Sequence, residues 1–175
     1  MKILWLVWGI LIAAIGMGPK APVVVISRSV MLEMDSLWVD GNRHWDELQN
    51  VATLSQLLGA VPTQREFFGC LAGMRSGDTV YVTRTVPATH VRRLQVAVSG
   101  TCVMTLLGTW HTHPYIADPK SNLPHKSRVL SEQDLMQFEK GNDDVTIVVW
   151  DVDSVDVAVR DSTGTIRHPA GVIVR

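Results

Sequence analysis

Apolar positions along this chain form several short runs that predict β-strands. The runs are rich in Val, Ile, Leu and Thr and are bounded by glycine or polar residues. The predicted strands cover residues 66–73, 79–83, 103–110, 145–150 and 155–159. Gly77-Asp78 predicts a hairpin turn between the first two strands, and Thr163-Gly164 predicts the turn of a last hairpin.

Two other segments place apolar residues three or four positions apart, as an amphipathic helix requires. Residues 46–58 carry a leucine-rich stripe that ends near Gly59. A second helix is predicted after Ser131, where the apolar positions are Leu135, Met136 and Phe138. These elements together predict an α/β fold, in which a mixed, mostly antiparallel sheet is flanked by helices, one before it and one after the strand that ends at residue 110.

The N-terminus differs in character from the rest of the chain. Residues 3–17 are uncharged and mostly apolar. The run is shorter than the roughly 20 residues of a membrane span, and Lys2 before it resembles the charged start of a signal peptide. A core helix is the alternative. We therefore divide the chain into residues 1–22, a signal anchor or assembly arm, and residues 23–175, one domain that is either membrane-anchored through residues 3–17 or cytoplasmic.

Composition indicates a folded domain that does not bind nucleic acid. Of the 175 residues, 46% are hydrophobic and 19% are charged, which is typical of a globular chain with a core. The net charge is −1, and no basic stripe is present, so nucleic acid is not an expected partner. Cys70 and Cys102 lie in or beside predicted core strands, where they either pair in an exported protein or stay as free thiols.

The most informative motif is His111-Thr112-His113-Pro114, which follows the predicted strand 103–110. Residues two apart on a strand point to the same side, so His111 and His113 are expected to project together, with Thr112 turned away. Two converging imidazoles are the start of a zinc site, although two surface histidines near a turn remain an alternative.

Two acidic residues are candidates to complete this site. Asp134 lies in the first turn of the helix that Ser131 is expected to cap, from where its carboxylate can face a metal or simply complete a capping box. Glu66 opens the predicted strand 66–73, where an isolated glutamate is normally an ordinary solvated residue.

In chain order, these residues form the patterns Glu-x-x-Gly-x-Leu-x-Gly, His-Thr-His-Pro and Ser-x-x-Asp. Residues 60–160 thereby resemble the JAB/MPN/Mov34 family with its JAMM zinc-peptidase motif. The resemblance implies an MPN/JAB sandwich of the cytidine-deaminase-like kind and one catalytic Zn²⁺. His111, His113 and Asp134 match the metal ligands, Glu66 matches the general base, and Ser131 matches the residue that stabilises the oxyanion.

The implied function is that of a zinc-dependent peptidase or isopeptidase acting on a protein or peptide, with the C-terminus of a ubiquitin-like protein as one candidate substrate. The alternative is a non-catalytic MPN-type assembly module tethered by its apolar N-terminus. One departure from the family pattern matters. Seventeen residues, 114–130, separate His113 from Ser131, where the family usually has seven. Asp118 and His125 in this insertion are rival metal ligands.

Overall fold

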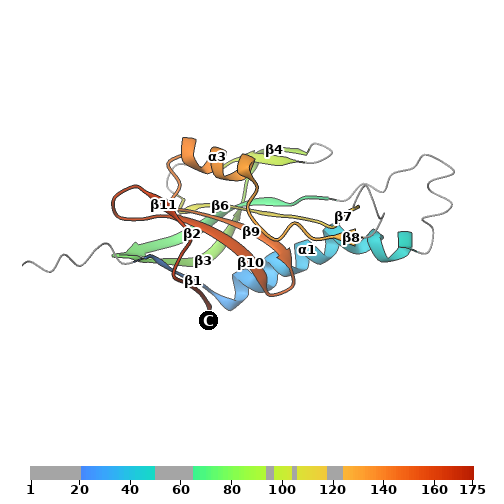
Figure 1. Cartoon of the computed structure of the whole chain (residues 1–175), viewed down its shortest axis with the longest axis horizontal. Helices are drawn as coiled ribbons and strands as arrows, with labels where there is room; N and C mark the ends of the chain where they lie inside the picture. The colour runs from blue at the N-terminus through green and yellow to red at the C-terminus, as the bar shows by residue number, and fades with distance from the viewer. Residues whose placement is uncertain (1–20, 50–64, 94–96, 104–105, 118–123) are drawn as a thin grey trace, which may run out of the picture.

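The structure is a computed structural model that describes residues 21–49, 65–93, 97–103, 106–117 and 124–175. Its main feature is one mixed, twisted sheet of eight strands (Figure 1). In chain order the elements are β1 (Val23–Ile26), α1 (Arg28–Gln49), β2 (Phe68–Ser76), β3 (Thr79–Pro87), β4 (Thr89–Arg93), β5 (Val98–Thr101), β6 (Gly108–Thr112), β7 (Ile116–Ala117), β8 (Pro124–His125), α3 (Glu132–Lys140), β9 (Val145–Asp151), β10 (Ser154–Arg160), β11 (Ile166–Arg167) and β12 (Gly171–Val174).

The eight-stranded sheet has the order β11-β10-β9-β6-β2-β3-β1-β12. Four of its seven pairings are antiparallel, and the pairs β6–β9, β1–β3 and β1–β12 are parallel. The strands β4 and β5 form a separate two-stranded ribbon, and β7 pairs with β8. Strand β6, which carries His111, therefore lies in the middle of the sheet between β2 and β9.

Both faces of the central strands are covered. Val145, Ile147 and Val149 of β9 pack in the larger core cluster with apolar residues of α1, while Val148 packs with Phe138 of α3 in a smaller cluster. All five residues from 145 to 149 are buried, as expected for a strand that is covered on two sides. The α3 face of β6 and β9 is the face on which the candidate site lies.

Helix α1 is built by an apolar stripe at helical spacing that includes Val30, Met31, Met34 and Trp38. Ser27 lies just before the helix, where its hydroxyl accepts a hydrogen bond from the Val30 N–H and its carbonyl accepts one from the Met31 N–H. This stripe faces β3, β6 and β9, so α1 supports the sheet behind the site.

The expected α/β sandwich of the MPN/JAB kind, with helices flanking the sheet, is wrong. The described part of the chain is mostly β, with twelve strands and two helices, and α3 is only nine residues long. The prediction underestimated the strand content because β4, β5, β11 and β12 are short and partly or largely exposed, so they carry no long apolar run.

The predictions for individual helices, strands and turns had different outcomes. Strands at 145–150 and 155–159 are confirmed, as are the turns at Gly77-Asp78 and Thr163-Gly164, whose glycines adopt positive φ angles of 58° and 84°. The strand predicted at 66–73 begins at Phe68, and only the end of the one predicted at 103–110 lies in β6. Of the predicted helix 46–58, only 46–49 are described, at the end of α1, and the apolar segment 3–17 lies outside the described residues. Neither described helix combines the length and apolar character that a membrane span needs.

Cys70 and Cys102 form a disulfide that closes a loop with a sequence separation of 32. Cys70 is fully buried in β2, and Cys102 follows β5 directly. The bond therefore fastens the β4–β5 ribbon to the central sheet, which decides between the two alternatives that the sequence left open for these cysteines.

Candidate metal centre

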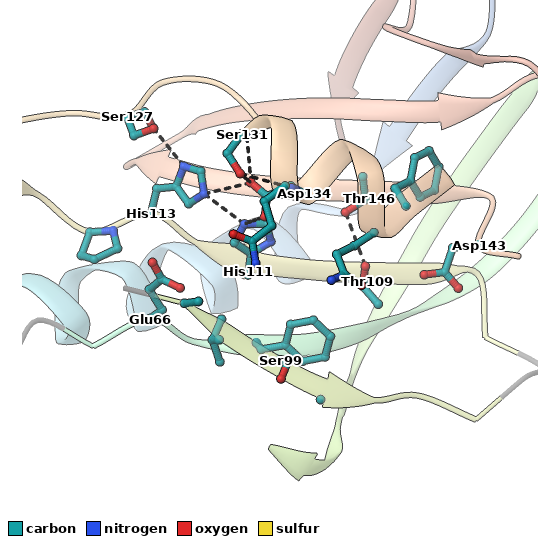
Figure 2. A pocket seen from close by; sticks show the side chains of 18 residues that line it. Glu66, Ser99, Thr109, His111, His113, Ser127, Ser131, Asp134, Asp143 and Thr146 are labelled. Carbon is teal, nitrogen blue, oxygen red and sulfur yellow. Dashed lines mark hydrogen bonds and ion pairs between the residues drawn. The ribbon is translucent and has the colours of Figure 1, made fainter. Parts of the chain in front are cut away.

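His111, His113 and Asp134 meet on the α3 face of the sheet (Figure 2). The Nε2 atoms of the two histidines are 3.0 Å apart. The Asp134 carboxylate lies 3.3 Å from His111 Nε2 through Oδ1 and 3.4 Å from His113 Nε2 through Oδ2. His111 is buried, and the other two residues are partly buried. These three side chains form a group that could hold a metal ion.

The local structure explains why these side chains converge. His111 lies in β6 and His113 one residue after its end, so both point to the same face, while Trp110 packs in the core on the other face. Asp134 approaches from the first turn of α3. Ser131 caps this helix in a complete capping box, in which the Asp134 side chain accepts from the Ser131 N–H at 2.8 Å. The Asp134 carboxylate therefore both caps α3 and lies against the two histidines.

One donor atom from each of the three side chains lies within 4.8 Å of the other two, close enough to surround a small ion. Nitrogen and oxygen ligands about 2.0–2.1 Å from a tetrahedral zinc ion lie about 3.3–3.4 Å from one another. Here the two Nε2 atoms are 3.0 Å apart, and each has a different Asp134 oxygen nearby, Oδ1 at 3.3 Å from His111 and Oδ2 at 3.4 Å from His113. Two imidazoles and one carboxylate are also a donor set that zinc accepts, with a fourth position left open.

Three contacts hold His113 in place, the first being the hydrogen bond that its backbone N–H donates to the Val149 carbonyl at 2.8 Å. Its Nδ1 lies 3.3 Å from the Ser127 carbonyl oxygen, an arrangement that favours the Nδ1–H tautomer and leaves Nε2 free to bind a metal. The indole Nε1–H of Trp38 in α1 donates to the His113 carbonyl at 3.0 Å. His113 is thus held by Ser127, which lies in the insertion 114–130, and by Trp38 of α1.

The Asp134 carboxylate is kept ionised by its neighbours. Burial alone would raise its pKa, but hydrogen bonds with His111, His113 and Ser131 outweigh burial and lower the pKa well below the ordinary value. The Ser131 hydroxyl donates to Asp134 Oδ2 at 2.7 Å and accepts from the Asp134 N–H at 3.2 Å. In this arrangement, the Ser131 hydroxyl directs its hydrogen to Asp134.

Glu66 reaches the same cavity from the segment before β2 (Figure 2). A hydrogen bond from the Val98 N–H of β5 holds its carboxylate. Burial raises the pKa of Glu66, and the nearby histidines partly oppose this shift. Gly41 of α1 allows the approach, because a Cβ at this position would lie 2.4 Å from the Arg65 carbonyl oxygen.

A cavity of about 600 Å³ is lined by the three candidate ligands, by Ser131 and by Glu66. The structure brings together all five residues that the sequence identified, namely Glu66, His111, His113, Ser131 and Asp134. Of the rival ligands, Asp118 lies outside the described residues, and the side chain of His125 is not described. Sequence reasoning missed Val98, Thr109, Asp143 and Thr146, which also line the cavity or hold a group in it, because none belongs to a recognisable motif.

A scan of protein-family models and a search of curated proteins found no match to this sequence. The family resemblance therefore stays a prediction that depends on the motif residues themselves.

Proposed function

We propose that this protein is a zinc-dependent peptidase or isopeptidase of the JAMM type. One observation supports the proposal above all others. Three potential metal ligands whose donor atoms lie within 4.8 Å of one another share a cavity with a partly buried glutamate. A purely structural metal site has four protein ligands and needs no such carboxylate beside it.

Each residue of the site has its own role in the proposed amide hydrolysis. Zinc held by His111, His113 and Asp134 would polarise the amide carbonyl and make a water molecule more acidic. Glu66 accepts a proton from that water as its oxygen adds to the carbonyl carbon. Glu66 then returns the proton to the nitrogen as the C–N bond breaks, so that a carboxylic acid and an amine leave. The raised pKa of Glu66 suits this role, because a general base must also release its proton.

Ser131 has two candidate roles. As observed, it positions Asp134 by accepting and donating hydrogen bonds. The family resemblance assigns it to the oxyanion, for which its O–H would have to turn from Asp134 toward the substrate. A donor aimed at the developing charge lowers the barrier more than it strengthens substrate binding.

The proposal is tested first by metal content. Full-length protein purified without chelators is expected to hold one zinc per chain by plasma emission. His113→Ala should weaken zinc binding by roughly 100-fold or more, since the loss of a direct ligand exceeds that of an outer partner. His168→Ala is the matched control, because His168 is exposed and lies outside the cavity. Full zinc content in His113→Ala would refute the ligand assignment.

Glu66→Gln then separates catalysis from metal binding. This variant keeps the shape of the side chain but cannot take a proton. With quenched peptide libraries and isopeptide-linked ubiquitin-like conjugates as substrates, we expect full zinc content and a fall in turnover of roughly 10²–10⁴. Loss of zinc would make Glu66 a ligand. A wild-type protein that holds zinc and cleaves none of these substrates would instead favour the assembly-module alternative.

A further inference from the structure

The cavity extends past the metal centre to a second polar group on the same face of the sheet. Thr109 of β6, Thr146 of β9 and Asp143 line this end, together with Phe138 of α3 (Figure 2). We call these four residues the Asp143 pocket. None of them takes part in the chemistry proposed above.

The sheet register fixes the distance between the two ends of the cavity. Thr109 lies two residues before His111 on β6, so the two side chains point the same way about 6.7 Å apart along the strand. Thr109 is paired with Thr146 in the parallel register, and their hydroxyl oxygens are 3.4 Å apart. The Thr109 hydroxyl also bonds to the Asp143 carboxylate.

The cavity carries an excess of negative charge at the end where Asp143 lies. Among the described residues that line it are the carboxylates of Glu66, Asp134 and Asp143, and none of these described lining residues is Lys or Arg. A divalent ion at the metal centre would offset the first two, which leaves Asp143. Burial raises the pKa of Asp143, and the nearby Arg160 only partly opposes this. The donors of Arg160 instead go to backbone carbonyls, those of Phe138, Gly141, Asp143 and Gly164.

We propose that the Asp143 pocket binds the ammonium or guanidinium group of a Lys or Arg residue adjacent to the scissile amide. The inference rests on the proposed peptidase function and adds a substrate class to it. A lysine stem of four methylenes is about 6 Å long when extended, which is comparable to the roughly 6.7 Å between Thr109 and His111 along β6. Asp143 supplies the charge opposite to that of such a group.

Binding of two matched hydroxamates tests this without a known substrate. Nα-acetyl-lysine hydroxamate and Nα-acetyl-norleucine hydroxamate share the zinc-binding group and differ in the terminal ammonium. By calorimetry on the zinc-loaded full chain, the lysine compound should bind about tenfold more tightly, as a charge pair at a half-buried site allows. Asp143→Asn should reduce this preference to about onefold. Asp144→Asn is the matched control, because Asp144 pairs with Arg75 and does not line the cavity.

The outcomes separate this inference from the function on which it rests. Equal binding of both hydroxamates by the wild type, or an unchanged preference in Asp143→Asn, would overturn the inference while leaving the zinc site intact. If the protein holds no zinc, the proposed function fails. The pocket is then tested by NMR shifts of the metal-free chain with the N-methylamides of the same two amino acids. No preference for the lysine compound in that titration would also overturn the inference.

Discussion

Removing the Cys70–Cys102 disulfide should both destabilise the protein and loosen its proposed general base. The bond closes a loop with a sequence separation of 32, and the loop contains β3, β4 and β5. In the chain-entropy treatment, a loop of this size corresponds to about 3.7 kcal/mol of stability at 25 °C. This is a large share of the roughly 5–15 kcal/mol by which a domain is normally stable.

The effect is best measured as the difference in unfolding free energy between the oxidised and the fully reduced wild type in urea. This comparison keeps both sulfur atoms and so removes no side-chain volume around buried Cys70. The double variant Cys70→Ala/Cys102→Ala provides a second measurement. It should lose slightly more unfolding free energy than the reduced wild type, because it also leaves a cavity in the core. Oxidised and reduced proteins of equal stability would refute the reasoning, because the cross-link would then restrict nothing in the unfolded chain.

The same change should affect hydrolysis more than metal binding. The three candidate ligands lie outside the closed loop, on β6, after it and on α3, so zinc content should stay near one per chain. Glu66, in contrast, accepts from the Val98 N–H of β5, and the bond fastens this strand to the sheet. Turnover should therefore fall by roughly tenfold on reduction, as expected when a positioned group loses its support. Loss of zinc on reduction would show that the ribbon also supports the ligands.

Three further predictions concern single residues. Gly41→Ala should displace the segment before Glu66, since its Cβ would meet a carbonyl oxygen, and should lower turnover at least tenfold with zinc content unchanged; equal turnover would show that the segment shifts freely. Ser131→Ala should cost about 1 kcal/mol in unfolding free energy through the lost cap, and a fall in kcat at constant KM would reveal an oxyanion role. Burial raises the pKa of Asp35, so its ionisation destabilises the folded state, and its contribution to stability falls as pH rises above the ordinary value of 3.8. Asp35→Asn should remove that loss, so the difference in unfolding free energy between this variant and the wild type should grow with pH. Glu33→Gln, on the exposed side of α1, should leave the dependence of unfolding free energy on pH unchanged.

The candidate metal centre was predictable from the sequence because its geometry is mostly local. The two-residue period of a strand aligns His111 with His113, and the start of a helix fixes Asp134 beside Ser131. The approach of Glu66 to them depends instead on the β2–β6 register, in which Phe68 faces His111. Only the family pattern indicated that long-range pairing.

Other features had no readable local signal. Asp143 looks like an ordinary loop residue, and only the pairing of β6 with β9 brings it beside Thr109. The edge strands are too short to give an apolar period, which is why the fold class was wrong. Helix α1 is a different case. Val30, Met31, Met34 and Trp38 do carry a helical period, yet the sequence prediction placed no helix there.

The position of β12 has a consequence for the order in which the protein folds. Strand β1 pairs with β3 on one side and with β12 on the other, with Val23 opposite both Thr79 and Gly171. The first pairing becomes possible early in synthesis, while the second joins segments at opposite ends of the described chain, and such distant contacts form slowly. Every element of the metal centre precedes β12. A nascent chain would therefore assemble the site first, with the free edge of β1 exposed to unwanted strand pairing until β12 covers it.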